Sequence, residues 1–408
     1  MRASYCRSVR LMVCSMPDRH VLMIAYDFPP GRGIGAGLRS GFFAQYLPKS
    51  GWLPQVISLD EGQTASAGVV RFASPTPWHS PYEMTPYGWA HALGRHLRAR
   101  NYPVDLVYVS CPPYPQALTA ASFARAKGIP LVVDFRDAWT LDPYQEGSRL
   151  KRVLYRYLFP SLEKRLLDRT DLLILNTPSS LEAYRERYPQ HADGMVWLPN
   201  GYDETAFASV PRPTARDSMQ LLYAGRFGIG ARSPDNLLQG LARVRERGLD
   251  VRLRVLGDQR EDTLRRIEQA QLDQMIEVLP QAPYSEAVAQ MCSADALVLV
   301  QAPARAPVQA VAGKTFDYLR AGRPVLAIAP PGDNVDLLKR HAHRLEHAQD
   351  TPDGIADAIH RLYDDWKDGR LDSASDVSDQ LARFDRRYLT QQLAKHFDRL
   401  VEAKGPLW

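Results

Sequence analysis

The chain has 408 residues, of which 45% are apolar and 24% charged, and its formal net charge is +5. This length suits about two domains, and the composition is that of an ordinary globular protein. No apolar run reaches the ~18 residues of a membrane-spanning helix. A net charge this small, without a recognition motif, also argues against nucleic-acid binding.

The first 18 residues combine positive charges with a short apolar stretch at 11–14. That stretch is shorter than the ~7–15 residues of a signal peptide. We expect residues 1–18 to be a disordered extension, with Met16 as the working start. The cysteines lack the spacing of a metal site, which is typical of a protein in a reducing cytosol. They are Cys6, Cys14, Cys111 and Cys292.

The first half of the chain alternates apolar strands with helical stretches, as in a parallel sheet that is covered on both faces. We predict strands at 21–26, 52–59, 69–72, 104–109, 130–134, 172–175 and 195–199. The first strand leads into a glycine-rich turn with Gly33, Gly35 and Gly37 and then into a helix. Because glycine lets a backbone come close to a phosphate, this turn is a candidate phosphate site. A plain connection between strand and helix is the alternative.

Charged residues follow the strand that begins at Pro130, in the stretch Asp134-Phe135-Arg136-Asp137. In open α/β sheets, ligands bind outside the carboxyl ends of the strands, so these side chains are candidates for a ligand site. The alternative is a structural cluster in which Asp134, Arg136 and Asp137 pair with one another.

Residues Arg149–Arg169 are rich in Arg and Lys and interleave aliphatic and aromatic side chains. This pattern suits a helix that lies on an anionic lipid surface. A solvated helix that packs through its aliphatic side would show the same pattern.

The second half of the chain begins after a polar, proline-containing hinge at 204–217. We predict strands near 221–225, 253–257, 275–279, 294–300 and 325–328, and closing helices at 351–368 and 376–403. Around the first of these strands, Arg226 and Arg232 lie six residues apart in a loop with several glycines.

A loop that ends in Gly313 leads into a short helix, which Gly322 terminates before the strand at 325–328. The amino terminus of such a helix favours a phosphate or a hydroxyl oxygen. Asp317, one turn inside the helix, can accept hydrogen bonds from ribose hydroxyls. A surface helix before a buried strand is the alternative.

The stretch Gly313-Lys-Thr-Phe-Asp-Tyr-Leu-Arg-Ala-Gly-Arg-Pro-Val325 resembles the donor-site signature of family-four retaining glycosyltransferases. It is most similar to the branch of bacterial cell-surface polysaccharide transferases. Asp-Phe-Arg-Asp-Ala-Trp at 134–139 and Asn-Gly-Tyr-Asp at 200–203 are similar to further motifs of that family. The resemblance spans roughly residues 20–400 and is specific at four short stretches.

The resemblance implies an α/β fold of two facing Rossmann-like domains (GT-B type) with a deep interdomain cleft. The acceptor-binding domain would comprise residues 19–205, completed by a C-terminal helix at about 386–408. The nucleotide-sugar-binding domain would comprise residues 206–385.

The resemblance also implies the site. In the family two Glu residues, separated by seven positions, frame the sugar and the ribose. Here these positions are Gln309 and Asp317, so both are altered. Catalytic roles fall to Asp137, Arg226 and Arg232, and acceptor-side roles to Arg136 and Asp137. The donor-binding positions are Gly33, Gly35, Gly37, Arg226, Arg232, Gln281, Gln309, Gly313, Lys314, Thr315 and Asp317.

The implied activity is transfer of a sugar from a nucleotide-diphosphate sugar to an acceptor hydroxyl with retention, in exopolysaccharide, O-antigen or capsule biosynthesis. We expect no metal and no cofactor, a lipid-linked or saccharide acceptor, and no nucleic-acid partner. The protein would be cytoplasmic and peripheral on the inner face of the membrane, which it would contact through Arg149–Arg169. Two alternatives stay open: a nucleotide-sugar epimerase of the same architecture, and a catalytically weak nucleotide-binding scaffold.

Overall fold

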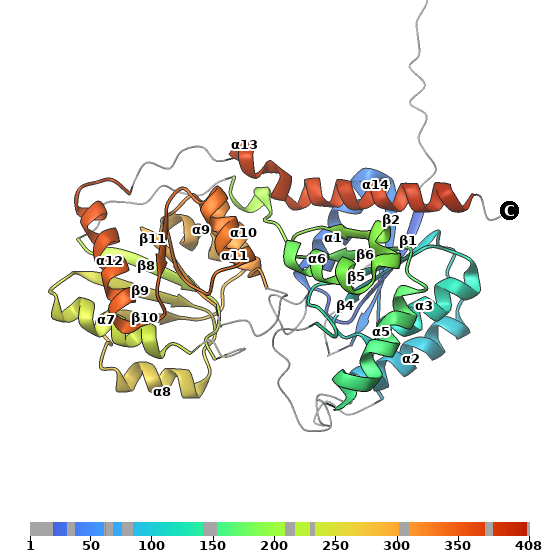
Figure 1. Ribbon diagram of the computed structural model, residues 1–408, viewed down its shortest axis with the longest axis horizontal. Coiled ribbons are helices and arrows are strands. Elements are labelled where there is room, and N and C mark those ends of the chain that lie inside the picture. Colours follow the sequence, from blue (N-terminus) through green and yellow to red (C-terminus); the bar gives the residue numbers. More distant parts are fainter. Residues whose placement is uncertain are drawn as a thin grey trace, which may run out of the picture.

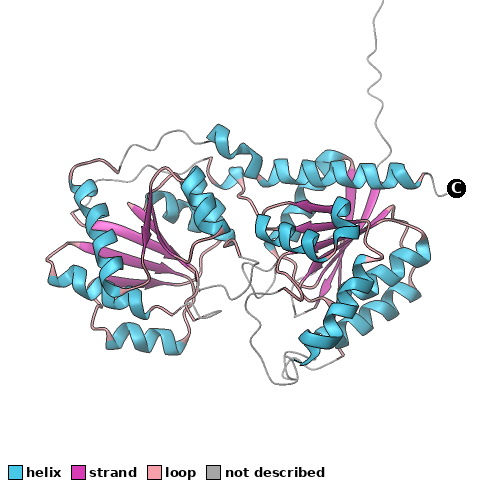
Figure 2. Cartoon of the chain, viewed as in Figure 1, coloured by secondary structure: helices cyan, strands magenta, loops and turns pink. Residues whose placement is uncertain are grey.

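The computed structural model describes residues 19–30, 37–60, 62, 68–75, 85–141, 153–208, 217–228, 233–301, 310–371 and 378–405. The expected extension at 1–18 lies outside them. The described residues form two α/β domains side by side, each with a parallel sheet between layers of helices (Figures 1 and 2). The predicted pair of Rossmann-like domains is confirmed.

The first domain contains a seven-stranded sheet in the order β3-β2-β1-β4-β5-β6-β7. The strands are β1 (Arg19–Ala25), β2 (Trp52–Leu59), β3 (Val69–Phe72), β4 (Leu106–Cys111), β5 (Leu131–Phe135), β6 (Leu172–Leu175) and β7 (Met195–Trp197). The helices are α1 (Leu38–Tyr46), α2 (Thr85–Ala99), α3 (Pro115–Lys127), α5 (Phe159–Leu167) and α6 (Pro178–Arg187). A π-helical turn, η2 (Leu154–Leu158), precedes α5.

The second domain contains a six-stranded sheet in the order β10-β9-β8-β11-β12-β13. The strands are β8 (Met219–Ala224), β9 (Val251–Leu256), β10 (Ile276–Leu279), β11 (Ala296–Val300), β12 (Val325–Ile328) and β13 (Leu345–Ala348). The helices are α7 (Asp235–Glu246), α8 (Glu261–Gln269), α9 (Tyr284–Ser293), α10 (Gly313–Ala321), α11 (Asp333–His341) and α12 (Pro352–Lys367).

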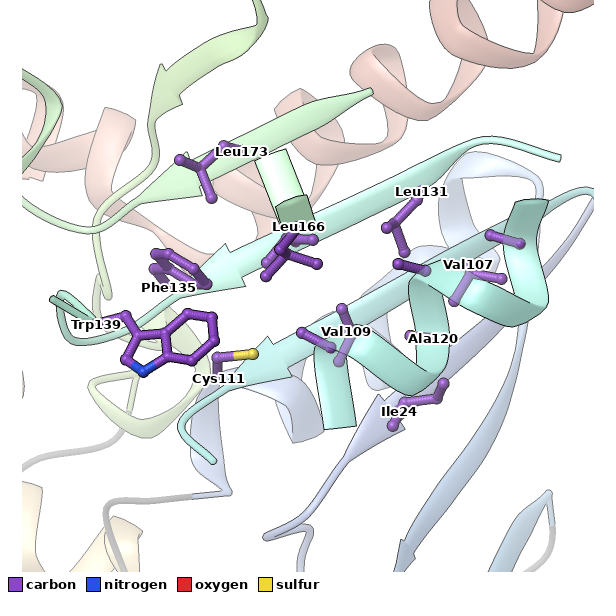
Figure 3. Packing of buried hydrophobic residues seen from close by; sticks show 14 of the residues in the cluster. Ile24, Val107, Val109, Cys111, Ala120, Leu131, Phe135, Trp139, Leu166 and Leu173 are labelled. Atoms are coloured by element: carbon purple, nitrogen blue, oxygen red, sulfur yellow. The ribbon is translucent and has the colours of Figure 1, made fainter. Parts of the chain in front are cut away.

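Apolar side chains alternate between the two faces of each sheet, which explains why the strands read as continuous apolar runs. In β1, Leu22 and Ile24 join one core layer, whereas Val21 and Met23 join the layer on the opposite face. Figure 3 shows the first of these layers, in which strand residues such as Val109 pack against α3 and α5. The second domain likewise has one apolar layer on each face of its sheet.

The chain ends by returning to the first domain. A short helix, α13 (Ser378–Leu381), and a 3₁₀ turn at 382–384 precede α14 (Arg386–Lys404), which lies along the first domain (Figure 1). There Phe397 is fully buried, with its ring centroid 5.2 Å from that of Trp52. Phe384 packs against Phe316 of the second domain, at 5.3 Å between ring centroids, and also lies 6.5 Å from Trp197 of the first. No helix among the described residues is both long and apolar enough to cross a bilayer.

In both sheets the strand order changes direction beside the first strand of the domain, between β1 and β4 and between β8 and β11. Ligands of open α/β sheets bind at the carboxyl ends of the strands near such switch points. The two domains contact each other through these ends, since the backbone N–H of Ser179, after β6, donates to the carboxylate of Asp333, after β12, at 3.0 Å. The carboxyl edges of the two sheets, which also carry the switch points, therefore meet at this contact.

Candidate functional site

The site in the second domain begins with two glycines that end neighbouring strands. Gly225 follows β8 with φ of +142°, and Gly257 follows β9 with φ of +130°. A Cβ atom on Gly257 would lie 3.2 Å from the carbonyl oxygen of Gly225, closer than ordinary contact. Because glycine alone tolerates this backbone and this approach, the two loops can meet.

One side chain holds both loops. The amide nitrogen of Gln259 donates to the carbonyl oxygens of Gly225 and Gly257, at 2.8 and 2.6 Å. Its amide oxygen accepts from the backbone N–H of Phe227, at 3.0 Å. Three bonds from one residue fix the loop after β8 in place, so the loop is organised before any ligand binds.

Lys314 lies in the first turn of α10 and extends toward this loop. Its ammonium group donates to the carbonyl oxygen of Ala224 at 2.9 Å and lies 3.8 Å from the centroid of the Tyr223 ring. A Cβ atom on Gly225 would come within 3.3 Å of that ammonium group. A fixed cation beside a helix amino terminus creates a positive potential that attracts an anion.

Arg226 follows Gly225 at the same strand end and is exposed. Its Nε donates to the carbonyl oxygen of Asp258 at 2.8 Å, and the Asp258 carboxylate accepts from the backbone N–H of Gln281 at 3.1 Å. These bonds connect the loops after β8, β9 and β10. The structure thus gathers Arg226, Gln281 and Lys314 around one end of the sheet, whereas Arg232 lies outside the described residues.

Asp317 is 6% exposed and accepts a 2.6 Å hydrogen bond from the Tyr284 hydroxyl. Burial raises the pKa of Asp317 to about 6, and the nearby Arg386 guanidinium partly offsets this shift. Arg386 opens α14 and lies 3.9 Å from the centroid of the Phe42 ring in α1. The carboxylate expected to contact ribose therefore stands where the second domain meets α1 and α14.

The other donor positions differ in accessibility. Thr315 is fully buried, and its hydroxyl donates to the side-chain oxygen of Asn334 at 2.6 Å. Its side chain therefore connects α10 to α11. Gly313 is exposed at the start of α10. Gly37 immediately precedes α1, and a Cβ atom there would lie 3.0 Å from Phe28 and Pro29. The remaining donor positions, Gly33, Gly35 and Gln309, lie outside the described residues.

The first-domain positions lie at the carboxyl end of its sheet. Asp137 is exposed after β5, and its carbonyl oxygen accepts from the Tyr114 hydroxyl at 2.9 Å. The guanidinium of Arg136 donates to the carbonyl oxygen of Pro112 at 2.9 Å and lies 3.8 Å from the carboxylate of Asp27. Burial raises the pKa of Asp27, and Arg136 partly opposes that shift.

The mutual pairing considered for Asp134 does not form. Asp134 is fully buried and accepts from the guanidinium of Arg39 at 2.7 Å and from the hydroxyl of Tyr108. Its side chain points to the sheet face that α1 covers, while Arg136 lies past the end of the strand. Arg39 also donates to the carbonyl oxygen of Pro199 at 2.6 Å, so it connects α1 to the segment that leads to the second domain.

Sequence reasoning missed Arg39, Asp27, Tyr284 and Asp333. Arg39 sits in a helical stretch without a neighbouring acidic residue, and its partner is 95 positions away. Nothing local distinguishes it from a surface arginine. Asp27 does carry a signal, because it follows the first strand directly, as Asp137 follows β5.

The second-domain loops thus bring two cations, Arg226 and Lys314, to the same end of the sheet. Cations beside a helix amino terminus suit an anionic ligand. Within the described part of the chain, no cluster of three or more His, Cys, Asp or Glu side chains could hold a metal ion. The expectation that the protein works without a metal stays a prediction.

Two family models match the chain, one on each sheet. A glycosyl transferase 4-like domain matches residues 34–201, and a domain of glycosyl transferases group 1 matches residues 218–365. No curated protein matches the chain in sequence.

Solved structures share the fold over nearly the whole chain. WaaG, a glycosyltransferase involved in lipopolysaccharide biosynthesis, has a TM-score of 0.69 at 16% identity, over 92% of this chain and 99% of its own. Sucrose-phosphate synthase from Thermosynechococcus elongatus has a TM-score of 0.68 at 15% identity, over 94% and 100% of the two chains. HepE from Anabaena, in complex with UDP and glucose, has a TM-score of 0.65 at 17% identity, over 94% and 100%.

A protein described as a UDP-N-acetylglucosamine 2-epimerase from Listeria monocytogenes is less similar. Its TM-score is 0.60 at 10% identity, over 93% of this chain and 97% of its own. At identities this low, the likeness to any of these structures shows the fold alone.

Proposed function

Because the chain belongs to the glycosyltransferases, with a 4-like domain followed by a group 1 domain, we propose a specific reaction for it. It transfers a sugar from a nucleotide-diphosphate sugar to an acceptor hydroxyl, and the anomeric configuration is retained. The second domain binds the donor and the first domain binds the acceptor.

The placement of Lys314 carries this proposal. Its ammonium group is anchored on Ala224 and lies beside Gly225, the residue that precedes Arg226, at the switch point of the second sheet. A nucleoside diphosphate seated there would meet two cations and the amino terminus of α10. As the glycosidic bond breaks, negative charge grows on the departing diphosphate, and these groups stabilise it more in the transition state than in the ground state.

In the proposed step the bond between the anomeric carbon and the diphosphate oxygen breaks, and its electron pair goes to the diphosphate. The acceptor oxygen attacks the same face of the sugar, and its proton passes to a departing phosphate oxygen. Asp137, exposed after β5, accepts a hydrogen bond from the acceptor hydroxyl and orients it. Arg136 sets the local charge through its contacts with Asp27 and Pro112.

The remaining donor contacts follow from the family motifs and from the place of these residues at the carboxyl end of the second sheet. The base meets the backbone near Gln281, which Asp258 fixes. The ribose meets Asp317, and Gly313 with Lys314 receives the diphosphate. Arg232 and Gln309, with Gly33 and Gly35, complete the site in this proposal. HepE, which was solved with UDP and glucose, supports a nucleotide-sugar donor.

The acceptor is lipid-linked and belongs to cell-surface polysaccharide synthesis in this proposal. Support comes from an exposed surface at η2, where Val153, Tyr157 and Leu158 are 48%, 66% and 46% exposed. The guanidinium of Arg156 lies 5.4 Å from the centroid of the Tyr157 ring. Apolar and aromatic groups beside Arg and Lys suit the headgroup region of an anionic bilayer. WaaG, which shares the fold, is involved in lipopolysaccharide biosynthesis.

A panel of radiolabelled nucleotide sugars, incubated with the protein and a bacterial membrane lipid extract, tests the function. We expect label in the lipid fraction from one donor, without added divalent metal. An epimerase would change or release the sugar without an acceptor, and a binding scaffold would do neither. Either result would overturn the proposed transfer.

A further inference from the structure

The start of α11 contacts the first domain directly. Gly332 precedes α11 with φ of +143°, a backbone that favours glycine, and it turns the chain into the helix. Asp333, the first residue of α11, accepts a hydrogen bond from the backbone N–H of Ser179 at 3.0 Å. Ser179 lies in the first turn of α6, where backbone N–H groups have no partner within the helix. A carboxylate of the second domain therefore caps a helix of the first.

The next residue faces the interior of the second domain. Asn334 is 2% exposed, and its amide donates to the side-chain oxygen of Gln301 at 2.6 Å. Its own oxygen accepts from the hydroxyl of Thr315 at 2.6 Å. Gln301, at the end of β11, also donates to the carbonyl oxygen of Ala310 at 2.7 Å. A buried polar chain of this kind is rigid when every bond is made, because an unmade bond leaves a buried group unsatisfied.

Asn334 thus fixes both the end of β11 and the start of α10. The helix α10 carries Lys314 and Asp317, and the adjacent Asp333 contacts the first domain. Two neighbouring residues on one helical turn cannot shift independently, since the helix backbone fixes their separation.

We propose that Asp333 and Asn334 couple the docking of the first domain to the arrangement of α10, so that Asp333 is a positioning residue for donor binding. The effect of this coupling on donor binding rests on the proposed function. The coupling itself is a property of the protein without ligand. A first domain that docks on Asp333 would hold α11 and, through Asn334, the first turn of α10.

Hydrogen exchange followed by mass spectrometry on the full chain tests the coupling without any ligand. In Asp333→Ala, amide exchange should rise in two separate peptides, residues 177–181 of the first domain and residues 310–316 of the second. The loss of one hydrogen bond predicts an increase of about threefold to tenfold in each. The second peptide is decisive, because a purely local cap would not affect it.

Two variants serve as controls. Asp336→Ala removes an exposed carboxylate from the same first turn of α11, so it reproduces the loss of charge at the helix amino terminus without touching Ser179. This variant should leave amide exchange in both peptides unchanged. Asp333→Asn keeps an oxygen that can accept from Ser179 and should restore protection in both.

If Asp333→Ala speeds exchange only at 177–181, or at neither peptide, the coupling is overturned. The proposed function is tested separately in the same experiment, by protection of residues 224–228 in the wild-type protein when UDP or another nucleoside diphosphate is added. Failure of that protection would count against the donor site and leave the coupling result standing.

Discussion

The ammonium group of Lys314 donates to the carbonyl oxygen of Ala224 at 2.9 Å and so joins the first turn of α10 to the end of β8. The Tyr223 ring supports the same group from one side, at 3.8 Å from the ring centroid. A cation held in this way does not have to be ordered when a ligand arrives, which lowers the entropic cost of binding.

Replacing Lys314 should therefore weaken binding of a nucleoside diphosphate. A charge-assisted contact is worth about 1.5–3 kcal/mol, so Lys314→Ala should raise the dissociation constant about tenfold to a hundredfold in calorimetry. Lys339→Ala, which removes an exposed lysine of α11, is the matched control and should bind normally. Equal affinities for the two variants would contradict the assignment of Lys314.

Removing Arg39 from its ion pair with Asp134 should destabilise the protein strongly, because it leaves a buried charge without a partner. Both side chains are buried, at 4% and 0% exposure, and Arg39→Met would leave the Asp134 carboxylate without its cation. Removing one partner of a buried pair costs about 3–5 kcal/mol, measurable by urea unfolding. Arg247→Met breaks a pair with Asp357 at 2.8 Å, in which the two side chains are 32% and 55% exposed, and should cost less than about 1 kcal/mol. Similar losses in both variants would show that burial of the first pair has no energetic consequence.

The stability of the protein should depend on the titration of Asp317. Burial raises the pKa of this carboxyl to about 6. Between about pH 4 and pH 6 the folded protein keeps a proton that the unfolded chain has lost, so stability from this group falls as the pH rises through that window. Relative to that of Asp317→Asn, the free energy of unfolding of the wild type should fall by on the order of 2–3 kcal/mol between pH 4 and pH 7. A stability difference that is constant over this range would contradict the shift.

The exposed apolar surface at η2 should bind anionic lipid. Tyr157→Ser should reduce cosedimentation with vesicles that contain phosphatidylglycerol, because it removes an aromatic side chain that is 66% exposed beside Arg156. Transfer to a water-soluble acceptor should not change. Tyr388→Ser, at a tyrosine of α14 that is 43% exposed, is the control and should bind vesicles as the wild type does. Equal cosedimentation of the two variants with the vesicles would contradict lipid binding by this surface.

The strands were predictable because apolar side chains occupy both faces of each sheet, as at Val21–Ala25. The exception is β13, whose sequence Leu-Glu-His-Ala is polar because it forms an edge of the second sheet. The helical pattern at 376–403 is divided in the structure between α13 and α14, whereas the resemblance implied a helix at about 386–408. The helix α14 begins at Arg386 because Asp385 caps it by accepting from the backbone N–H of Arg387 at 2.8 Å.

Long-range partners were the part that the sequence did not reveal. Phe397 packs against Trp52 of the first domain, and Phe384 lies against Phe316 of the second domain and, at 6.5 Å between ring centroids, against Trp197 of the first. Tyr388 stays exposed. Each of these aromatic residues fits an amphipathic helix equally well. Which of them contacts the first domain depends on where the chain crosses from one domain to the other. Asp333 was missed for the same reason, because its partner Ser179 lies 154 positions away.

The central claim is that cations of the second domain hold the diphosphate of the donor. The most direct measurement is calorimetric titration of UDP and UMP, and of the corresponding pairs with other bases, in the presence of a metal chelator. For the cognate base, the diphosphate should bind at least about tenfold more tightly than the monophosphate, because only it reaches all the cations. Arg232→Ala should remove most of that difference and lower the rate of sugar transfer about tenfold or more. Equal affinities for the two nucleotides, or an unchanged preference in Arg232→Ala, would contradict the account.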